Sequence, residues 1–300
     1  MKGKCVLDYV GNTPMVQLRN IGGGRVFAKA EFLNPSGSVK DRIAKYLIEE
    51  AERTGELRPG SIIMEPSSGN TGIGMVFVGV QKGYRVIIVM PEDMSEERKK
   101  IIKALGGELI LTPAKQCVDG CIEKVNELAR KNRRIYIPQQ FENPRNPEIH
   151  YKTTAREIWK QMDGRIGAFV AGVGSGGTLV GVGKYLKEKK QSIKIVALEP
   201  ENSAALLGRE PGFHQIQGIG DGFIPKIVKM NMSVIDEVIT VSDDNAIATT
   251  RKLARKEGLL VGTSSGANVW GAQKLSKKIK GNIVTVLPDR AERYFSTSLI

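Results

Sequence analysis

Short apolar runs alternate with amphipathic stretches along the chain. Several apolar runs, such as Val86-Ile87-Ile88-Val89, are rich in β-branched residues and show no polar alternation, which is typical of parallel strands covered on both faces. Strands are predicted at Ser61–Met64, Arg85–Met90, Glu108–Leu111, Ala168–Gly172, Lys194–Glu199, Glu237–Val241 and Asn282–Leu287. Helices are predicted at Asp41–Thr54, Thr71–Lys82, Ser95–Leu105, Asp119–Arg130, Tyr151–Met162, Gly176–Lys189, Asp243–Glu257 and Gly266–Ile279. This alternation predicts an α/β architecture with right-handed crossovers.

Local signals refine the ends of these elements. Asp243 is the predicted N-cap of the helix that follows it, and Gly106 and Gly258 are predicted helix stops. The segment 139–147 is rich in Asn, Gln and Pro, and we interpret it as a hinge between two domains.

The charge balance changes this picture little. Lys and Arg number 45 against 32 Asp and Glu, a net charge of +13, which raises the question of a nucleic-acid partner. The basic residues are interleaved with acids and lack the aromatic and fold motifs of nucleic-acid modules. We interpret them as solvated helix faces with a general preference for anionic ligands, and we expect no nucleic-acid partner.

Other broad function classes also find no support. No apolar stretch is long enough to span a membrane and the N-terminus has no apolar signal core, so we expect no membrane partner. The three cysteines, Cys5, Cys117 and Cys121, together with His150 and His214, lack the spacing of metal ligands. We therefore predict free thiols, no metal and a cytoplasmic location.

Lys40 lies in the most informative local sequence, the segment 34–42. A Pro/Ser/Gly turn precedes it, and apolar residues at helical spacing follow it, which places Lys40 in the first turn of a helix. The positive end of the helix dipole opposes an ammonium there and lowers the lysine pKa. A lysine with a lowered pKa is suited to Schiff-base chemistry.

Two loops that are rich in glycine, serine and threonine each join a predicted strand to a predicted helix. In the segment 172–178, glycines allow backbone N–H groups to converge on an anion. The P-loop lysine and the full dinucleotide-binding spacing are missing, so a strand-to-helix turn without a ligand is the alternative. In the segment 65–72, amides and hydroxyls can hold a carboxylate. Helix capping by Ser67 or Ser68 is the alternative there, and the two roles can coexist.

Taken together, these segments resemble the fold-type-II pyridoxal-phosphate (PLP) enzymes, specifically the cysteine synthase (O-acetylserine sulfhydrylase) and cystathionine β-synthase family. The resemblance extends from about residue 8 to residue 297. The matching segments are Gly11–Pro14, Asn34–Arg42, Glu65–Gly72, Gly172–Thr178, Gln217–Gly220, Gly262–Gly266 and Pro288–Asp289.

The resemblance implies a tryptophan-synthase-β-like fold, with two three-layer α/β/α domains and mostly parallel sheets. Residues 35–145 would form the smaller N-terminal domain, and residues 1–34 plus 146–300 the larger C-terminal domain. PLP would lie in the cleft between them. A homodimer is expected on the same basis.

The resemblance also assigns roles to site residues. Lys40 would be the Schiff-base lysine and general base, Asn70 would bond the cofactor's 3′ oxygen, and Ser264 would bond its pyridine nitrogen, with Ser265 as the alternative. The predicted phosphate cup comprises Gly174, Ser175, Gly176, Gly177 and Thr178. The predicted substrate-binding residues are Ser67, Ser68, Gly69, Thr71, Gln140 and Gly218.

The sequence departs from the family pattern at three places. Ser67 stands where the family usually has Thr, which removes a methyl and keeps the hydroxyl. Asp221 stands where cysteine synthases usually carry a small apolar residue, in a loop that faces the substrate. It is therefore a second candidate catalytic residue, and a loop aspartate on the surface is the alternative. Arg290-Ala291 replaces the usual Ser-Gly, and we expect a changed surface contact there.

These features predict an enzyme. The predicted reaction is PLP-dependent β-replacement, in which O-acetylserine and sulfide give L-cysteine. The alternative keeps this mechanism but starts from L-cysteine or L-serine and releases hydrogen sulfide or water, with Asp221 activating water or a thiol. That would make the protein a cysteine lyase or a lanthionine- or cystathionine-forming enzyme. A catalytically silent binding module is disfavoured because Lys40 and the predicted phosphate cup are both present.

Overall fold

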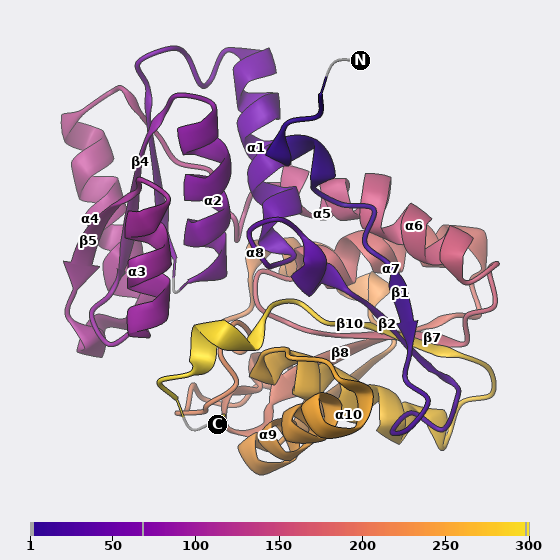
Figure 1. Cartoon of the computed structure of the whole chain (residues 1–300). Coiled ribbons are helices and arrows are strands. Elements are labelled where there is room, and N and C mark those ends of the chain that lie inside the picture. Colours follow the sequence, from indigo (N-terminus) through magenta and orange to yellow (C-terminus); the bar gives the residue numbers. More distant parts are fainter. Residues whose placement is uncertain (1–2, 68, 298, 300) are drawn as a thin grey trace.

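The computed structural model describes residues 3–67, 69–297 and 299. Its strands form two sheets (Figure 1), a four-stranded sheet in the order β5-β4-β3-β6 and a six-stranded sheet in the order β1-β2-β10-β7-β8-β9. The pair β1–β2 is antiparallel, and every other pairing in the two sheets is parallel. The strands are β1 (Met15–Gln17), β2 (Val26–Lys29), β3 (Ile62–Pro66), β4 (Arg85–Pro91), β5 (Glu108–Thr112), β6 (Ile135–Tyr136), β7 (Ala168–Gly172), β8 (Lys194–Pro200), β9 (Glu237–Val241) and β10 (Ile283–Val286).

Each predicted strand is present within two residues of its predicted ends. The sequence patterns missed β1, β2 and β6, which have only three, four and two residues. Runs of that length are too short to show a period of two or to stand out as an apolar block. Their pairing with longer neighbours defines them as strands.

The helices are α1 (Lys40–Thr54), α2 (Asn70–Gln81), α3 (Glu96–Ala104), α4 (Cys117–Lys131), α5 (Arg145–Ile149), α6 (Ala155–Gln161), α7 (Gly177–Lys189), α8 (Lys226–Lys229), α9 (Asp243–Lys252) and α10 (Thr263–Ser276). A π-helical turn over 150–154 joins α5 to α6, so this helical segment begins at Arg145 and not at Tyr151 as predicted. The prediction that Asp243 is an N-cap is wrong, because Ser242 holds that position and its hydroxyl accepts from the Asn245 N–H. The correct cap lies one residue earlier, where the backbone is still extended.

Helices cover both faces of each sheet. Apolar residues of α1, α2 and α3 pack with one face of the four-stranded sheet, and α4 packs on the other. Residues of α9 and α10 cover one face of the six-stranded sheet, and those of α6 and α7 cover the other. This burial explains the apolar runs of β4 and β8, in which every residue after the first is buried. The predicted fold class, with two three-layer α/β/α units and mostly parallel sheets, is confirmed.

The start of the chain contributes to the sheet formed by its end. Strand β2 pairs with β10 in the register Val26↔Ile283, and β1 adds to the other side of β2. The four-stranded sheet uses only strands between residues 62 and 136. We propose that the domain bounds are 35–145 and 1–34 plus 146–300, which would place each sheet in one domain.

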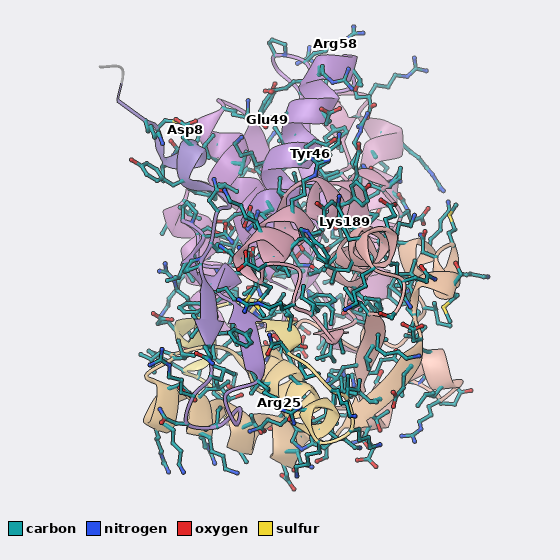
Figure 2. All side chains as sticks on the ribbon, turned by 90° about the vertical axis from the view of Figure 1, so that its right-hand side faces the viewer. Asp8, Arg25, Tyr46, Glu49, Arg58 and Lys189 are labelled. Carbon is teal, nitrogen blue, oxygen red and sulfur yellow. The ribbon has the colours of Figure 1, made fainter. Side chains whose placement is uncertain are left out.

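Cationic side chains are distributed over the molecule. Figure 2 shows Arg58 and Arg25 at opposite ends, beyond α1 and beside the six-stranded sheet respectively. Within residues 3–67, 69–297 and 299, no helix is long and apolar enough to cross a membrane. The same residues contain no cluster of three or more His, Cys, Asp or Glu side chains that could hold a metal ion.

Candidate active site

A single pocket collects most of the predicted site residues from both sheets. The predicted residues that line it are Lys40, Ser67, Asn70, Thr71, Gln140, Gly174–Thr178, Gly218, Asp221 and Ser264. Gly69 is buried next to the pocket and does not line it. The prediction for Ser68 lies outside the described residues. Sequence positions as far apart as Lys40 and Ser264 therefore meet at one place, although their roles stay predictions.

Lys40 is the first residue of α1, as its sequence context predicted. The turn before it is closed by Asp41, whose carboxylate accepts from the Ser36 N–H at 2.7 Å and from the Ser36 hydroxyl. Desolvation in the pocket lowers the pKa of Lys40, against the opposing pull of the Asp221 and Asp289 carboxylates. A lowered pKa makes a neutral amine more available, which Schiff-base formation and proton abstraction both need.

The loop between β7 and α7 has the shape of an anion cradle. A Cβ atom at Gly174 would collide with the Gly218 carbonyl, one at Gly176 with Val228, and one at Gly177 with Asn146. Gly176 also has a positive φ of 79°, so glycine is favoured there for its backbone as well. Within the described chain no side chain caps the start of α7, and the first N–H groups of a helix lack intrahelical acceptors. These features fit the phosphate of PLP.

His150 supports this loop and was missed by the sequence analysis. Its Nε2 lies 3.2 Å from the Thr178 hydroxyl, and its Nδ1 lies 2.9 Å from the Thr154 hydroxyl. Burial, with the nearby Arg42 and Lys40 charges, lowers the pKa of His150 to about 3, so the ring is neutral. It acts as a hydrogen-bond partner that orients Thr178. The contact with Thr178 depends on how this helical segment packs on α7, and no local sequence signal reports it.

The loop after β3 combines helix capping with pocket lining. The Ser67 hydroxyl accepts from the N–H groups of Gly69 and Gly72 at 3.1 and 3.0 Å. Thr71 donates to the Gln140 side chain at 2.5 Å, which joins the loop to the segment predicted as a hinge. Behind them, buried Glu65 accepts from the Gln140 N–H at 3.1 Å, and burial raises the pKa of Glu65 to about 7.

Ser264 and Ser265 are separated by the geometry. Both are buried in the first turn of α10, but only Ser264 lines the pocket. The Ser265 hydroxyl is turned away into the protein and has no hydrogen-bond partner among the described residues. The arrangement favours Ser264 as the side chain that would face the cofactor ring.

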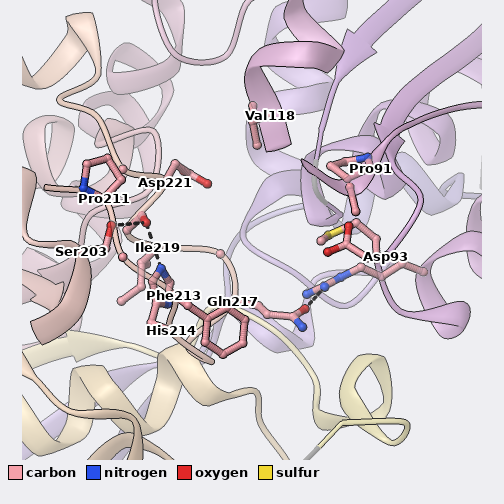
Figure 3. Close-up of a pocket in the computed structure, with 17 residues that line it drawn as sticks. Pro91, Asp93, Val118, Ser203, Pro211, Phe213, His214, Gln217, Ile219 and Asp221 are labelled. Atoms are coloured by element: carbon pink, nitrogen blue, oxygen red, sulfur yellow. Dashed lines mark hydrogen bonds between the residues drawn. The ribbon is translucent and has the colours of Figure 1, made fainter. Parts of the chain in front are cut away.

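Asp221 lies where the pocket opens into a larger cavity of about 450 Å³. Figure 3 shows Asp221, Ile219 and Pro211 on one wall, with Pro91 and Val118 across from them. His214 donates from Nε2 to the Gly220 carbonyl at 2.9 Å, because its Nδ1 accepts from the Ile216 N–H. Desolvation raises the pKa of Asp221, and the charge of Lys40 opposes this rise. The carboxyl group is therefore within the field of Lys40 and is not a remote surface residue.

The expectation of a changed surface contact at Arg290-Ala291 is wrong. Ala291 is buried. Arg290 donates from Nε to the Phe32 carbonyl at 2.9 Å and packs over Gly37, three residues before Lys40. The reason is that the chain after β10 turns back over the start of α1, which sequence patterns do not report.

Comparisons with known proteins agree with this geometry. The family model for pyridoxal-phosphate dependent enzymes matches residues 6–289. The cysteine synthase of Staphylococcus aureus is 49% identical over 98% of this chain and 96% of its own. The crystal structure of the O-acetylserine dependent cystathionine β-synthase from Helicobacter pylori has 42% identity and a TM-score of 0.94, covering 100% of this chain and 99% of its own.

A third relative is named for a different activity. The hydrogen sulfide-producing enzyme from Fusobacterium nucleatum is 39% identical with a TM-score of 0.92, over 98% of this chain and 100% of its own. The family match spans most of the chain, and the pocket is lined by Lys40, the glycine cradle and the hydroxyl-bearing residues Ser67 and Thr71. The chain therefore belongs to the pyridoxal-phosphate dependent enzymes.

Proposed function

We propose that the protein is a cysteine synthase, which makes L-cysteine from O-acetylserine and sulfide by β-replacement. The observation that carries this proposal is the convergence on one pocket of Lys40, the cradle at 174–178 and three residues of the loop after β3, namely Ser67, Asn70 and Thr71. The identity of 49% to a cysteine synthase over nearly the full length supports the same reaction.

Bound PLP supplies an electron sink for the bonds at the substrate Cα. The residues of the chain supply the rest. The Lys40 amine, with its lowered pKa, accepts the proton from Cα. Ser264 would offer a neutral hydroxyl to the cofactor ring. With this partner the ring would withdraw electrons less strongly than with a carboxylate partner, which suits a reaction in which a group departs from Cβ.

The loop at 67–71 would hold the substrate carboxylate. Ser67 and Thr71 line the pocket, and the Ser67 hydroxyl would be a donor toward the carboxylate. The hydrogen bond from Thr71 to Gln140 ties this loop to the other predicted carboxylate contact. Closure of the loop on the substrate would exclude water from the reactive centre.

A second candidate function rests on Asp221. Its carboxyl lies in the pocket, and desolvation raises its pKa, which makes the carboxylate a stronger base toward water or a thiol. The reaction would then start from L-cysteine or L-serine and release hydrogen sulfide or water. The similarity to a hydrogen sulfide-producing enzyme supports this alternative.

One experiment tests the role of Lys40. Reduction of the purified yellow protein with borohydride should fix the cofactor to the peptide that contains Lys40. Label on another lysine would contradict the assignment. Lys40→Ala should stop proton exchange at Cα while some PLP stays bound through the cradle.

A substrate panel separates the two functions. Wild type and Asp221→Ala are assayed with O-acetylserine, serine, cysteine and O-phosphoserine, each with and without sulfide or homocysteine. The first function is supported if Asp221→Ala still makes cysteine from O-acetylserine and sulfide, and if its rates with every other pair of substrates stay within about twofold of wild type. Selective loss of the reactions of cysteine or serine in the variant would favour the second.

Assembly and location belong to the same proposal. We expect a homodimer in the cytoplasm, without a nucleic-acid partner, on the strength of the family resemblance and the dispersed charge. Sedimentation equilibrium of the purified protein measures the assembly, and a monomer at assay concentration would refute the dimer.

A further inference from the structure

The segment 289–294, here called the C-terminal strap, crosses from β10 to the pocket. We propose that Asp289 and Arg293 of this strap are positioning residues that lock the Asn70 amide in one orientation, with an N–H turned to the cofactor. This inference rests on the proposed cofactor site and is independent of which amino acid and nucleophile the enzyme uses.

The Asn70 side chain is held from both ends. Its Nδ2 donates to Asp289 Oδ2 at 2.6 Å, and its Oδ1 accepts from Arg293 Nη1 at 2.9 Å. A guanidinium can only donate and a carboxylate can only accept. If the Asn70 amide were rotated by half a turn, its NH2 group would face the donor of Arg293 and its oxygen would face the acceptor of Asp289. Both hydrogen bonds would then be lost. The network itself decides the orientation.

This orientation leaves a donor for the pocket. An amide nitrogen carries two hydrogens, and Asp289 takes one of them. Asn70 lines the pocket with Lys40 and Ser264, so the second N–H is available to the cofactor's ring oxygen. The opposite orientation would present a carbonyl oxygen, which would repel that oxygen.

The two partners are themselves fixed. Asp289 is fully buried and also accepts from the Tyr294 hydroxyl at 2.5 Å. Its Oδ1 lies against Gly262, where a Cβ would collide with it. Arg293 is 2% exposed and donates to the carbonyls of Gly37, at 3.1 Å, and of Ser36.

The strap therefore touches every segment that carries a ring contact. Arg293 holds the turn before Lys40, Asp289 holds the loop before Ser264, and both hold Asn70.

The test compares Asp289→Asn with Tyr294→Phe in the PLP-loaded protein. The amide introduced at 289 can donate as well as accept, so it no longer opposes a turned Asn70, and only the donor of Arg293 still does. Tyr294→Phe removes the other hydrogen bond to the same carboxylate oxygen and leaves Asn70 held, which makes it the matched control. The readouts are the visible absorption band of the bound cofactor and the pH dependence of that band.

We expect the band of Asp289→Asn, and its pH midpoint, to shift toward those of Asn70→Ala. Tyr294→Phe should keep the wild-type spectrum even if its melting temperature falls. The double variant Asp289→Asn/Asn70→Ala should show no shift beyond Asn70→Ala alone, because both changes remove the same contact.

Wild-type spectra for Asp289→Asn, beside a shifted spectrum for Asn70→Ala, would overturn the positioning role while leaving the proposed function intact. Fully additive shifts in the double variant would also overturn it. If Asp289→Asn does not fold, Arg293→Lys tests the other partner of Asn70, because it keeps the charge but loses the planar group that donates to Asn70 and both carbonyls. A smaller shift in the same direction is expected, and a wild-type spectrum for this variant would overturn the positioning role.

Discussion

Two polar clusters flank the start of α1, and they differ in how completely their charges are matched. The first, here called the paired-ion cluster, contains Lys29, Glu31, Arg42 and Glu157, with two charges of each sign. Arg42 forms a two-bond contact with Glu31 at 2.7 and 2.8 Å and another with Glu157 at 2.7 Å for both bonds. Every charge in this cluster has a direct partner of opposite sign.

The second cluster consists of the C-terminal strap and Arg98 of α3. Arg98 donates to the Gln217 side chain, and its guanidinium lies 4.9 Å from the centre of the Tyr294 ring. Among the described residues, Arg98 Nε and Asp289 Oδ1 are buried without a hydrogen-bond partner. This cluster therefore has donor and acceptor capacity left over beside the pocket.

The difference indicates two roles. Both clusters join the four-stranded unit to the six-stranded unit, since Arg42 and Arg98 belong to the first and their partners to the second. In the paired-ion cluster every charge is neutralised by a protein side chain, so this cluster stabilises the contact between the two units without a ligand. On the strap side, Asp289 and Arg293 hold Asn70, while Arg98 Nε and Asp289 Oδ1 keep hydrogen-bonding capacity that no described residue uses.

The largest expected effect comes from removing Arg42. Arg42→Met should lower the free energy of unfolding by roughly 3–5 kcal/mol, because Glu31 would be left buried without its partner. Denaturant unfolding measures the loss. The control is Arg53→Met, which breaks the exposed pair with Glu50 and should cost little, because solvent screens the attraction between exposed charges. An equal loss of unfolding free energy in the two variants would mean that the paired-ion cluster does not stabilise the contact between the two units.

The pH dependence of stability should identify the same cluster. Paired with Arg42 and Lys29, Glu157 has its pKa lowered to about 2, below the value near 4.5 expected when unfolded. The unfolded chain therefore takes up the proton first, and the contribution of Glu157 is lost as the pH falls from about 4.5 to about 2. It is fully present above that window.

The measurement is denaturant unfolding of wild type and Glu157→Gln at several pH values. The difference in the free energy of unfolding between wild type and variant should be constant above about pH 5 and should narrow toward about pH 2. At about 1.36 kcal/mol per pKa unit, the total change is up to roughly 3 kcal/mol. A gap that does not change with pH would contradict an ionic role for Glu157.

A smaller effect is expected on the strap side. Arg98→Met keeps the apolar bulk but leaves the Gln217 acceptor without its donor, so it should cost about 1–3 kcal/mol. Because Arg98 lines the cavity next to Asp221, the Michaelis constant should change as well, whereas Arg42→Met should alter stability alone. Steady-state kinetics and denaturant unfolding of both variants provide the comparison. If Arg98→Met lowers stability but leaves the Michaelis constant unchanged, the proposed difference between the two clusters is contradicted.

The sequence by itself determined much of this molecule. The apolar runs of β4 and β8 have to be covered on both faces, which dictates a layered α/β fold. Two further features can be recognised from local sequence: the Pro/Ser/Gly turn before Lys40 and the glycines at 174–177. A tight turn and a close approach of the backbone each require those residue types at those positions. The predicted site residues that line the pocket come from such segments.

Only the tertiary structure decided which distant segments meet. The start of the chain pairs with β10, the strap reaches Asn70, His150 supports Thr178, and Asp221 comes into the field of Lys40. Local patterns do not report these contacts, since each depends on how two sheets and their connections pack. Only the family resemblance placed residues 1–34 with the C-terminal domain and Asp221 in a loop that faces the substrate. The motif 11–14 is the clearest case: the Thr13 hydroxyl donates to Glu31 at 2.6 Å. It therefore supports the paired-ion cluster and does not line the pocket, because the packing of the two units places it behind Lys40, where buried charges need satisfied partners.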